Sequence, residues 1–94
     1  MIRSFANKET AAIFRRERAR ALPASLQRAA LRKLLILDAA VSLDDLRVPP
    51  GNRLEVMHGD RAGQHSIRIN DQWRICFRWR GGDVEDVEIV DYHR

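Results

Sequence analysis

Residues able to transfer protons gather near the end of this chain, where Asp91, Tyr92 and His93 follow one another. A second histidine, His58, and an arginine, Arg74, stand upstream of them. Cleavage of RNA by side chains alone needs a base for the 2′-OH, an acid for the leaving 5′-oxygen and a cation for the charge developing on phosphorus. Histidine transfers protons near neutral pH, tyrosine can do so beside a cation, and arginine can be that cation. These five residues are candidates for cutting a phosphodiester; a solvated tail at 91–93 is the competing interpretation.

The residues that must position this chemistry follow Arg53, where the sequence alternates with a period of two. Turn residues near 70–72 and 81–83 interrupt the alternation. This pattern predicts an antiparallel β-meander with one buried face. The residues predicted on that face are Leu54, Val56, His65, Ile67, Ile69, Trp73, Ile75, Phe77, Trp79, Val87 and Ile89.

Side-chain parity also predicts the register of two hairpins, because paired residues in antiparallel strands share a face. A three-residue loop at 70–72 keeps the apolar residues of both flanking strands on one face. The same rule at 81–83 predicts these pairs: Arg80 with Val84, Arg78 with Asp86, Phe77 with Val87, Ile75 with Ile89, Cys76 with Glu88 and Trp73 with Asp91. Tyr92 then lies on the polar face, diagonal to Arg74 and within its reach.

Two helices are expected to cover the apolar face of the meander. Asn7 is a suitable N-cap for a helix over residues 7–20, with Ile13 and Phe14 facing inward. Pro23 suits the first turn of a second helix that continues to about residue 40. The buried stripe of this second helix is predicted from Leu26, Ala30, Leu34 and Leu37, widened by Leu31 and Leu35.

The remaining segments complete an α+β fold. Residues 1–5 are β-compatible and predict an edge strand, and residues 41–53 predict a loop. The predicted architecture is an N-terminal helical hairpin packed on a small antiparallel β-meander, in a single domain over residues 1–94.

Positive charge is concentrated in the first part of the chain. Residues 1–38 hold nine lysines and arginines against three acids, a net of +6, whereas residues 39–94 hold eight arginines against ten acids, a net of −2. Such asymmetry fits either an ordinary solvated helix face or a polyanionic partner, and arginine suits phosphate better than lysine does. The arginines that would meet this partner are Arg15, Arg16, Arg18 and Arg20.

Other residues have simpler expected roles. Cys76, the single cysteine, cannot form an internal disulfide and is expected to be an inert thiol. Arg78 and Asp86 are expected to form a cross-strand ion pair, His65 to pack against the core, and both tryptophans to be core residues. The histidines lack metal-ligand spacing, so no metal or other cofactor is expected. No segment is apolar enough for a signal peptide or membrane span, which predicts a cytoplasmic protein.

The combination of motifs resembles the HigB toxins, or plasmid maintenance killer proteins, of the RelE/ParE superfamily. The resemblance covers nearly the whole chain, from an opening of the type Met-Ile-X-Ser-Phe to the last residues. Its specific part consists of Gly59-Asp60-Arg61, Ser66-Ile67-Arg68-Ile69-Asn70, Asp71-Gln72-Trp73-Arg74-Ile75 and Asp91-Tyr92-His93. It implies a RelE-like fold and a toxin that enters the ribosomal A site and cleaves mRNA there without a metal. It also implies a HigA-type helix-turn-helix antitoxin that neutralises the toxin and represses the operon.

The resemblance also implies roles for individual residues. Asp91, Tyr92 and His93 fall on the active-site tail of the family, and Arg74 falls on its phosphate-binding arginine. Independently of the resemblance, Arg68 lies on the same predicted strand face and is expected to support Arg74 in contacting RNA. Arginines 15, 16, 18 and 20 would grip ribosomal RNA.

Some family members carry a histidine and a lysine where this chain has Glu55 and His58. The assignment of acid and base therefore stays open, with His58 as a possible replacement for a lost group. Fold alone does not decide activity. Two alternatives remain: a ParE-like toxin that inhibits gyrase without cutting RNA, and an inactive homologue that only binds antitoxin.

Overall fold

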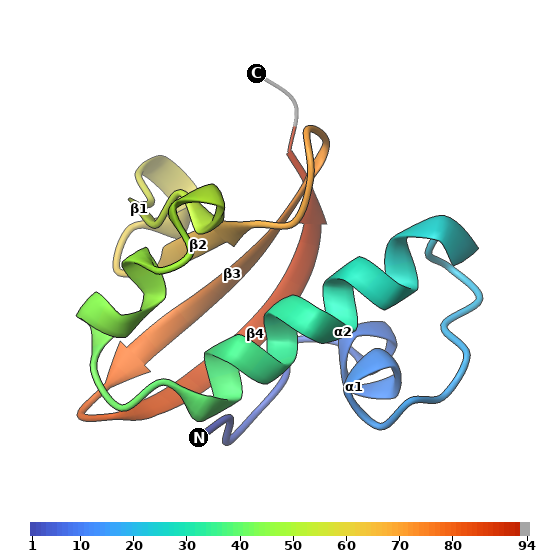
Figure 1. The fold of residues 1–94 in the computed structure, drawn as a ribbon, viewed down its shortest axis with the longest axis horizontal. Helices are drawn as coiled ribbons and strands as arrows, with labels where there is room; N and C mark the ends of the chain where they lie inside the picture. The colour runs from blue at the N-terminus through green and yellow to red at the C-terminus, as the bar shows by residue number, and fades with distance from the viewer. Residues whose placement is uncertain (93–94) are drawn as a thin grey trace.

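The computed structural model describes residues 1–92 and has the predicted α+β architecture (Figure 1). A four-stranded antiparallel sheet in the order β1-β2-β3-β4 packs against two helices. The elements are α1 (Lys8–Phe14), α2 (Ala24–Ala39), β1 (Glu55–Val56), β2 (His65–Arg68), β3 (Trp73–Arg80) and β4 (Asp83–Asp91), with 3₁₀ turns η1 (Leu43–Arg47), η2 (Pro50–Asn52) and η3 (Gly59–Arg61). No helix within residues 1–92 has both the length and the apolar character needed to cross a bilayer.

The first helix begins as predicted and ends earlier than predicted. The Asn7 side chain accepts a hydrogen bond from the Thr10 amide at 2.9 Å and caps α1. Arg16 then adopts a left-handed conformation with φ 61°. The Arg16 amide bonds the Ile13 carbonyl, and the Glu17 amide bonds the Ala12 carbonyl, which is the Schellman pattern that ends a helix. The prediction of a helix to residue 20 was wrong because glycine usually signals this motif, and here an arginine occupies its position.

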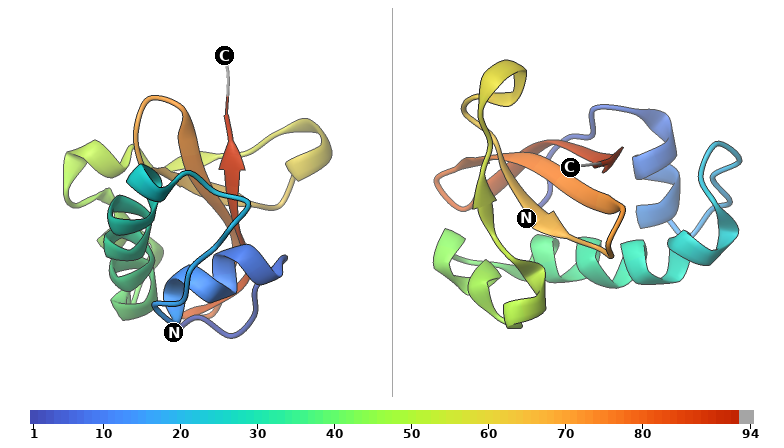
Figure 2. Two further views of the ribbon diagram at one scale, coloured as in Figure 1. Left: turned by 90° about the vertical axis from the view of Figure 1, so that its right-hand side faces the viewer. Right: turned by 90° about the horizontal axis from the view of Figure 1, so that it is seen from above.

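The second helix buries the predicted stripe. Leu26, Ala30, Leu34 and Leu37 are each at most 2% exposed and belong to the core. Leu31 is only partly buried and Leu35 is 39% exposed, so the stripe is narrower than predicted. Both helices lie on the same side of β3 and β4 (Figure 2), where they cover Ile67, Ile75, Phe77, Val87 and Ile89.

The N-terminal segment lies along the outer edge of β4, as predicted for an edge strand. It forms two isolated parallel bridges, Ile2 with Val84 and Phe5 with Val87, rather than a continuous strand. Between them, the Ser4 hydroxyl accepts a hydrogen bond from the Asp86 amide at 2.9 Å. The β4 edge is thereby covered, and β1 forms the other edge of the sheet.

The β2–β3 hairpin has the predicted three-residue loop, with Ile67 opposite Ile75 and Arg68 opposite Arg74. The β3–β4 hairpin differs near its turn. Gly81 and Gly82 have φ 56° and 94° and form a two-residue turn, which pairs Arg80 with Asp83 instead of Val84.

A bulge restores the predicted register farther along the β3–β4 hairpin. The ladder shifts between Cys76 and Arg78, and Asp86 on β4 has a left-handed φ of 54°. The predicted pairs Arg80–Val84, Arg78–Asp86 and Phe77–Val87 are therefore absent from the ladder. The predicted pairs Ile75–Ile89, Cys76–Glu88 and Trp73–Asp91 are confirmed.

Burial of β1 also differs from the prediction. Val56 is opposite His65, which is opposite Phe77, so Val56 lies on the core face as predicted. It is nevertheless 60% exposed because β1 is the outermost strand, whereas Met57 is 6% exposed.

Candidate active site

The face of the sheet opposite the helices carries a polar row across all four strands. Glu55 of β1 pairs with Ser66 of β2, Ser66 with Cys76 of β3, and Cys76 with Glu88 of β4. Paired residues share a face, so these side chains project to the same side. Arg74 projects to that side too, because it precedes Cys76 by two positions on β3.

Arg74 is the most firmly held residue of this face. It is 5% exposed, and its Nε donates a hydrogen bond to Ser66 Oγ at 2.7 Å. Its Nη2 donates to the carbonyl oxygens of Arg53 at 2.6 Å and of Ser66 at 3.2 Å. The same nitrogen lies 3.9 Å from Glu55 Oε2. A buried guanidinium needs such partners, and they fix its orientation.

The predicted proximity of Arg74 and Tyr92 is confirmed. The guanidinium carbon of Arg74 lies 5.9 Å from the centre of the Tyr92 ring, a cation–π distance. The backbone of Tyr92 is held by a hydrogen bond from its amide to the Gln72 carbonyl at 2.6 Å. The neighbouring Asp91 carboxylate accepts a hydrogen bond from the Gln72 amide side chain at 3.0 Å.

Arg74 and Tyr92 line a cleft of about 360 Å³, with Arg53, Glu55, Arg68, Asn70 and Asp71. Arg68, predicted to contact RNA, is paired with the Asp71 carboxylate on the rim of this cleft. The cleft therefore combines guanidinium groups with a phenol and carboxylates at one end of the sheet.

His58 lies in a second cleft of about 540 Å³ that shares Glu55 and Tyr92 with the first. The structure thus brings His58 to the same end of the sheet as Arg74. The two residues line different clefts, and Glu55 and Tyr92 form the boundary between these clefts. Val56, Met57, Asp60 and Arg61 complete the second cleft. His93 lies outside the described residues.

The basic segment predicted to bind RNA is distinct from both clefts. All four of its arginines (15, 16, 18 and 20) are exposed, and they lie on the connection between α1 and α2 rather than within a helix. They line shallow grooves with Lys8, Gln27 and Arg28. This connection and strand β1 occupy opposite sides of the molecule in Figure 1.

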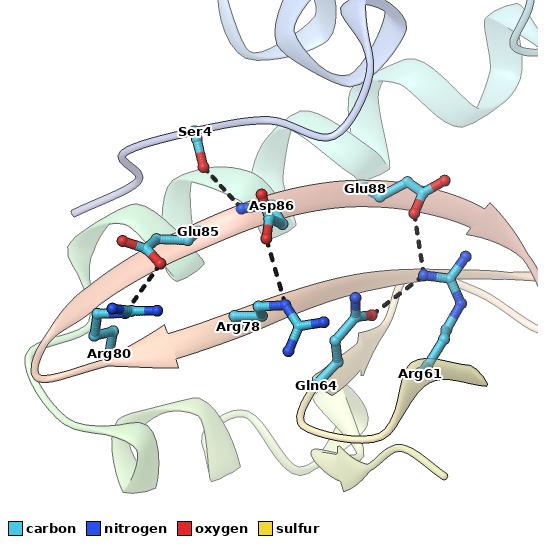
Figure 3. Close-up of polar contacts among 8 residues, drawn as sticks. All are labelled: Ser4, Arg61, Gln64, Arg78, Arg80, Glu85, Asp86 and Glu88. Carbon is cyan, nitrogen blue, oxygen red and sulfur yellow. Dashed lines mark hydrogen bonds and ion pairs between the residues drawn. The ribbon is translucent and has the colours of Figure 1, made fainter. Parts of the chain in front are cut away.

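Three ion pairs extend along the polar face of the β3–β4 hairpin (Figure 3). Arg78 contacts Asp86 at 3.4 Å, so the predicted ion pair is confirmed although the bulge removes the predicted register. Arg80 contacts Glu85 at 3.2 Å. From the η3 turn, Arg61 contacts Glu88 at 3.0 Å. The Arg61–Glu88 pair holds the η3 segment against the sheet, and the other two pairs join β3 to β4.

Cys76 lies beneath this surface and is completely buried. Burial is the main cause that raises the pKa of its thiol, which supports the predicted inert role. His65 is half-buried and its ring stacks with Phe77 at 6.1 Å, so its predicted packing role is confirmed. Both tryptophans are partly buried against the core. In residues 1–92, no three His, Cys, Asp or Glu side chains gather in an arrangement that could hold a metal ion.

Comparison with known proteins identifies the family. The family profile described as "RelE-like toxin of type II toxin-antitoxin system HigB" matches residues 3–93. The chain belongs to the HigB-like toxins. It is 50% identical to Toxin HigB-1 of Vibrio cholerae over 66 residues, which are 70% of each protein. It is 30% identical to Endoribonuclease HigB of Proteus vulgaris over 93 residues, 99% of this chain and 100% of that protein. Membership of a type II system means that this HigB-like toxin has an antitoxin partner.

Two cleft residues of this HigB-like toxin were not assigned a role from sequence. The sequence marks Glu55 only as a departure from the family pattern, yet its carboxylate lies close to Arg74 and lines both clefts. Arg53 lies at the end of the segment predicted to be a loop. Its place in the cleft depends on a left-handed backbone, which a non-glycine residue does not signal.

Proposed function

We propose that this HigB-like toxin is a ribosome-dependent endoribonuclease that cleaves mRNA in the ribosomal A site without a metal. The observation that carries the proposal is the pairing of Arg74 with Tyr92 in one cleft at the end of the sheet. The name of the Proteus vulgaris relative, an endoribonuclease, supports it. In this reaction the 2′-oxygen loses its proton to a base and attacks phosphorus. The 5′-oxygen then leaves with a proton from an acid, giving a 2′,3′-cyclic phosphate and a 5′-hydroxyl.

Arg74 would stabilise the charge that develops on the phosphoryl oxygens. Its hydrogen bonds to Ser66 and to the Arg53 carbonyl hold the guanidinium in place before substrate binds. A preorganised cation stabilises the transition state without reorganising during the reaction. Arg68, on the same cleft, would assist by binding RNA.

Proton transfer would be shared among Tyr92, Asp91, His93 and His58. Tyr92 borders both clefts, so its hydroxyl can reach an RNA strand that passes from one to the other. Tyr92 is a candidate for one of the two proton transfers, and the Arg74 guanidinium lies beside its ring. His58 in the second cleft is the candidate for the opposite proton transfer.

The exposed arginines between α1 and α2 would hold the toxin on ribosomal RNA, at a distance from the cleft. A separate basic surface adds affinity without contacting the scissile bond. Replacing all four arginines (15, 16, 18 and 20) with glutamine should lower ribosome binding in sedimentation assays and weaken its salt dependence, while thermal stability is unchanged. Ribosome binding at the wild-type level would contradict this role.

The proposed regulator is a cognate HigA-type helix-turn-helix antitoxin, and the proposed compartment is the cytoplasm, where translating ribosomes are found. Antitoxin binding provides a practical test of folding that does not depend on catalysis. A toxin variant that has lost its activity should still co-purify with the antitoxin.

The test is induced expression without antitoxin, followed by mapping of the 5′ ends of a reporter mRNA by primer extension. Cultures carry the wild type, a truncation after Val90, Tyr92→Phe, or the control Arg80→Ala. The Phe variant keeps the ring beside Arg74 and removes only the hydroxyl, so loss of a proton-transfer group should lower cleavage about 10²- to 10⁴-fold. Arg80 is exposed at the end of β3 that is far from Arg74, and the Arg80→Ala variant should cut normally.

New cuts that require translation and disappear in both tail variants would support the proposal. Growth arrest with DNA damage and without cuts would instead indicate a ParE-like inhibitor of gyrase. Healthy cells containing folded wild-type protein that binds antitoxin would indicate an inactive homologue. Cuts of equal intensity in the truncation would contradict the assignment of residues 91–93.

A further inference from the structure

We propose that Arg53 binds a phosphate of the RNA inside the Arg74 cleft, a role that rests on the proposed nuclease function and adds a residue to it. The Arg53 side chain is exposed and lines the cleft beside Arg68, Arg74 and Tyr92. No role for this residue follows from the motifs of the sequence. Its backbone conformation, its charge environment and its contact with Arg74 support this role.

The backbone of Arg53 is held in a conformation that arginine rarely adopts. Its φ and ψ are 44° and 60°, in the left-handed region. Its amide bonds the Pro50 carbonyl at 3.1 Å, and its carbonyl accepts the 2.6 Å hydrogen bond from Arg74 Nη2. A non-glycine residue keeps such a conformation only where its surroundings enforce it, and these positions concentrate at functional sites.

The residue before Arg53 anchors this turn to the protein interior. Asn52 is completely buried, and its amide nitrogen donates to the carbonyls of Leu46 and Val48 at 3.2 Å each. Its side-chain oxygen accepts a hydrogen bond from Lys33 Nζ of α2 at 2.5 Å. Arg53 is therefore presented to the cleft from a turn that is fixed on both sides, by Asn52 before it and by Arg74 at its carbonyl.

Charge balance in the cleft depends on Arg53. The lining holds three arginines and two carboxylates. Arg68 is paired with Asp71, and Arg74 lies near Glu55. Among residues 1–92, no carboxylate lies within ion-pair distance of the Arg53 guanidinium. Removing Arg53 would leave two arginines against two carboxylates, and the net attraction for a phosphodiester would disappear.

A fourth cation behind the cleft strengthens this field. Burial lowers the pKa of Lys33, and the positive charges of Arg32 and Arg68 lower it further. Lys33 is therefore close enough to interact electrostatically with Arg68 of the cleft, and its Nζ donates a hydrogen bond to the Asn52 side chain. An incoming phosphate would relieve repulsion among these cations, which favours binding of an anion at this position.

Arg74 and Arg53 accordingly divide two tasks. Arg74 is almost entirely buried and holds the Arg53 carbonyl, while Arg53 extends an exposed guanidinium from the same contact. One phosphate could thus contact both the fixed, buried guanidinium of Arg74 and the exposed guanidinium of Arg53, which reaches toward the RNA strand. Arginine's planar fork suits this outer contact, since it can bind two phosphate oxygens at once.

The experiment measures single-turnover cleavage of mRNA on programmed ribosomes with an empty A site. The variants are Arg53→Gly, Arg53→Asn and Arg53→Lys. Glycine and asparagine both accept the left-handed backbone, so they remove the guanidinium and keep the turn. Cleavage by these two variants should fall about 10- to 100-fold, the effect of losing a hydrogen bond to a charged group. Lysine keeps the charge without the fork and should recover part of the rate.

The matched control is Arg47→Ala, which removes an exposed arginine on η1 outside the cleft. It should cut at the wild-type rate. Thermal unfolding and antitoxin binding should be unaffected in all variants. Wild-type cleavage by both Arg53→Gly and Arg53→Asn would overturn the inference and leave the nuclease function standing. Absence of cleavage by the wild type would overturn both.

Discussion

At residues 74–77 the two faces of β3 are about equally buried and have opposite chemistry. On the helix side, Ile75 and Phe77 are 0% exposed and belong to the apolar core. On the other side, Cys76 is 0% and Arg74 is 5% exposed, but Arg74 is surrounded by hydroxyl, carbonyl and carboxylate oxygens. Burial alone therefore does not distinguish core from site in this toxin. Non-directional packing stabilises the fold on one face, and directional hydrogen bonds position the candidate site on the other.

The largest effect is expected on the helix side. Phe77→Ala removes the largest fully buried side chain and should lower the free energy of unfolding by about 3–5 kcal/mol. Since small domains are stable by only about 5–15 kcal/mol, toxicity and antitoxin binding should fall together. Urea denaturation measures the stability, with Phe77→Leu as the milder control. Normal stability of the alanine variant would contradict the assignment of this face as the core.

Substitution on the opposite face should separate activity from folding. Arg74→Ala should lower ribosome-dependent cleavage by about 10²- to 10³-fold, as removal of a preorganised transition-state donor does. Its stability should fall by only about 1–3 kcal/mol, because Ser66 Oγ and the Arg53 carbonyl lose their donor. Single-turnover cleavage and antitoxin co-purification measure the two effects. A variant that folds and still cuts normally would remove Arg74 from the mechanism.

Local chemistry made much of the fold predictable. Asn7 is a good cap in any context, the α2 stripe follows from its period, and the 70–72 loop follows from parity. The pairing of Arg74 with Tyr92 was predictable for a less direct reason. Compared with a plain two-residue turn, a three-residue loop shifts the register of β4 against β3 by one residue. A two-residue turn followed by a bulge at Asp86 gives the same shift. The register at the cleft end is therefore the same in both cases.

The errors share a physical cause. Arg16, Arg53 and Asp86 adopt left-handed backbones although none is glycine. Local hydrogen bonds close the helix end at Arg16, and tertiary hydrogen bonds hold Arg53 and Asp86. The first ends α1 early, the second builds one wall of the cleft, and the third makes the bulge. Val56 shows a second limit: alternation predicts which face a residue occupies, whereas its burial depends on how far the neighbouring layer extends.

An intermediate effect on the free energy of unfolding is expected when the pH is raised far enough to ionise the Cys76 thiol. Because burial raises the pKa of its thiol in the folded state, the unfolded chain releases this proton first. The group should not change stability below about pH 8.5, the pKa of an ordinary thiol, and above it stability should fall by at most about 1.4 kcal/mol per pH unit. Urea denaturation from pH 7 to 10, compared with Cys76→Ala, isolates this contribution. Parallel curves for the two proteins would contradict it.

The smallest effect is expected from the substitution of Arg78, which lies four residues along β3 from Arg74. Arg78 occupies the same strand and the same face, but its side chain is 43% exposed and its partner Asp86 is 54% exposed. Because water screens such a pair, Arg78→Ala should cost under about 1 kcal/mol and leave cleavage unchanged. The comparison with Arg74→Ala is direct, since the substitution, strand and face are the same. If Arg78→Ala impaired cleavage as strongly, a general positive field rather than a positioned guanidinium would account for activity. If only Arg74→Ala impairs it, the fixed hydrogen bonds of that one arginine are what the reaction requires.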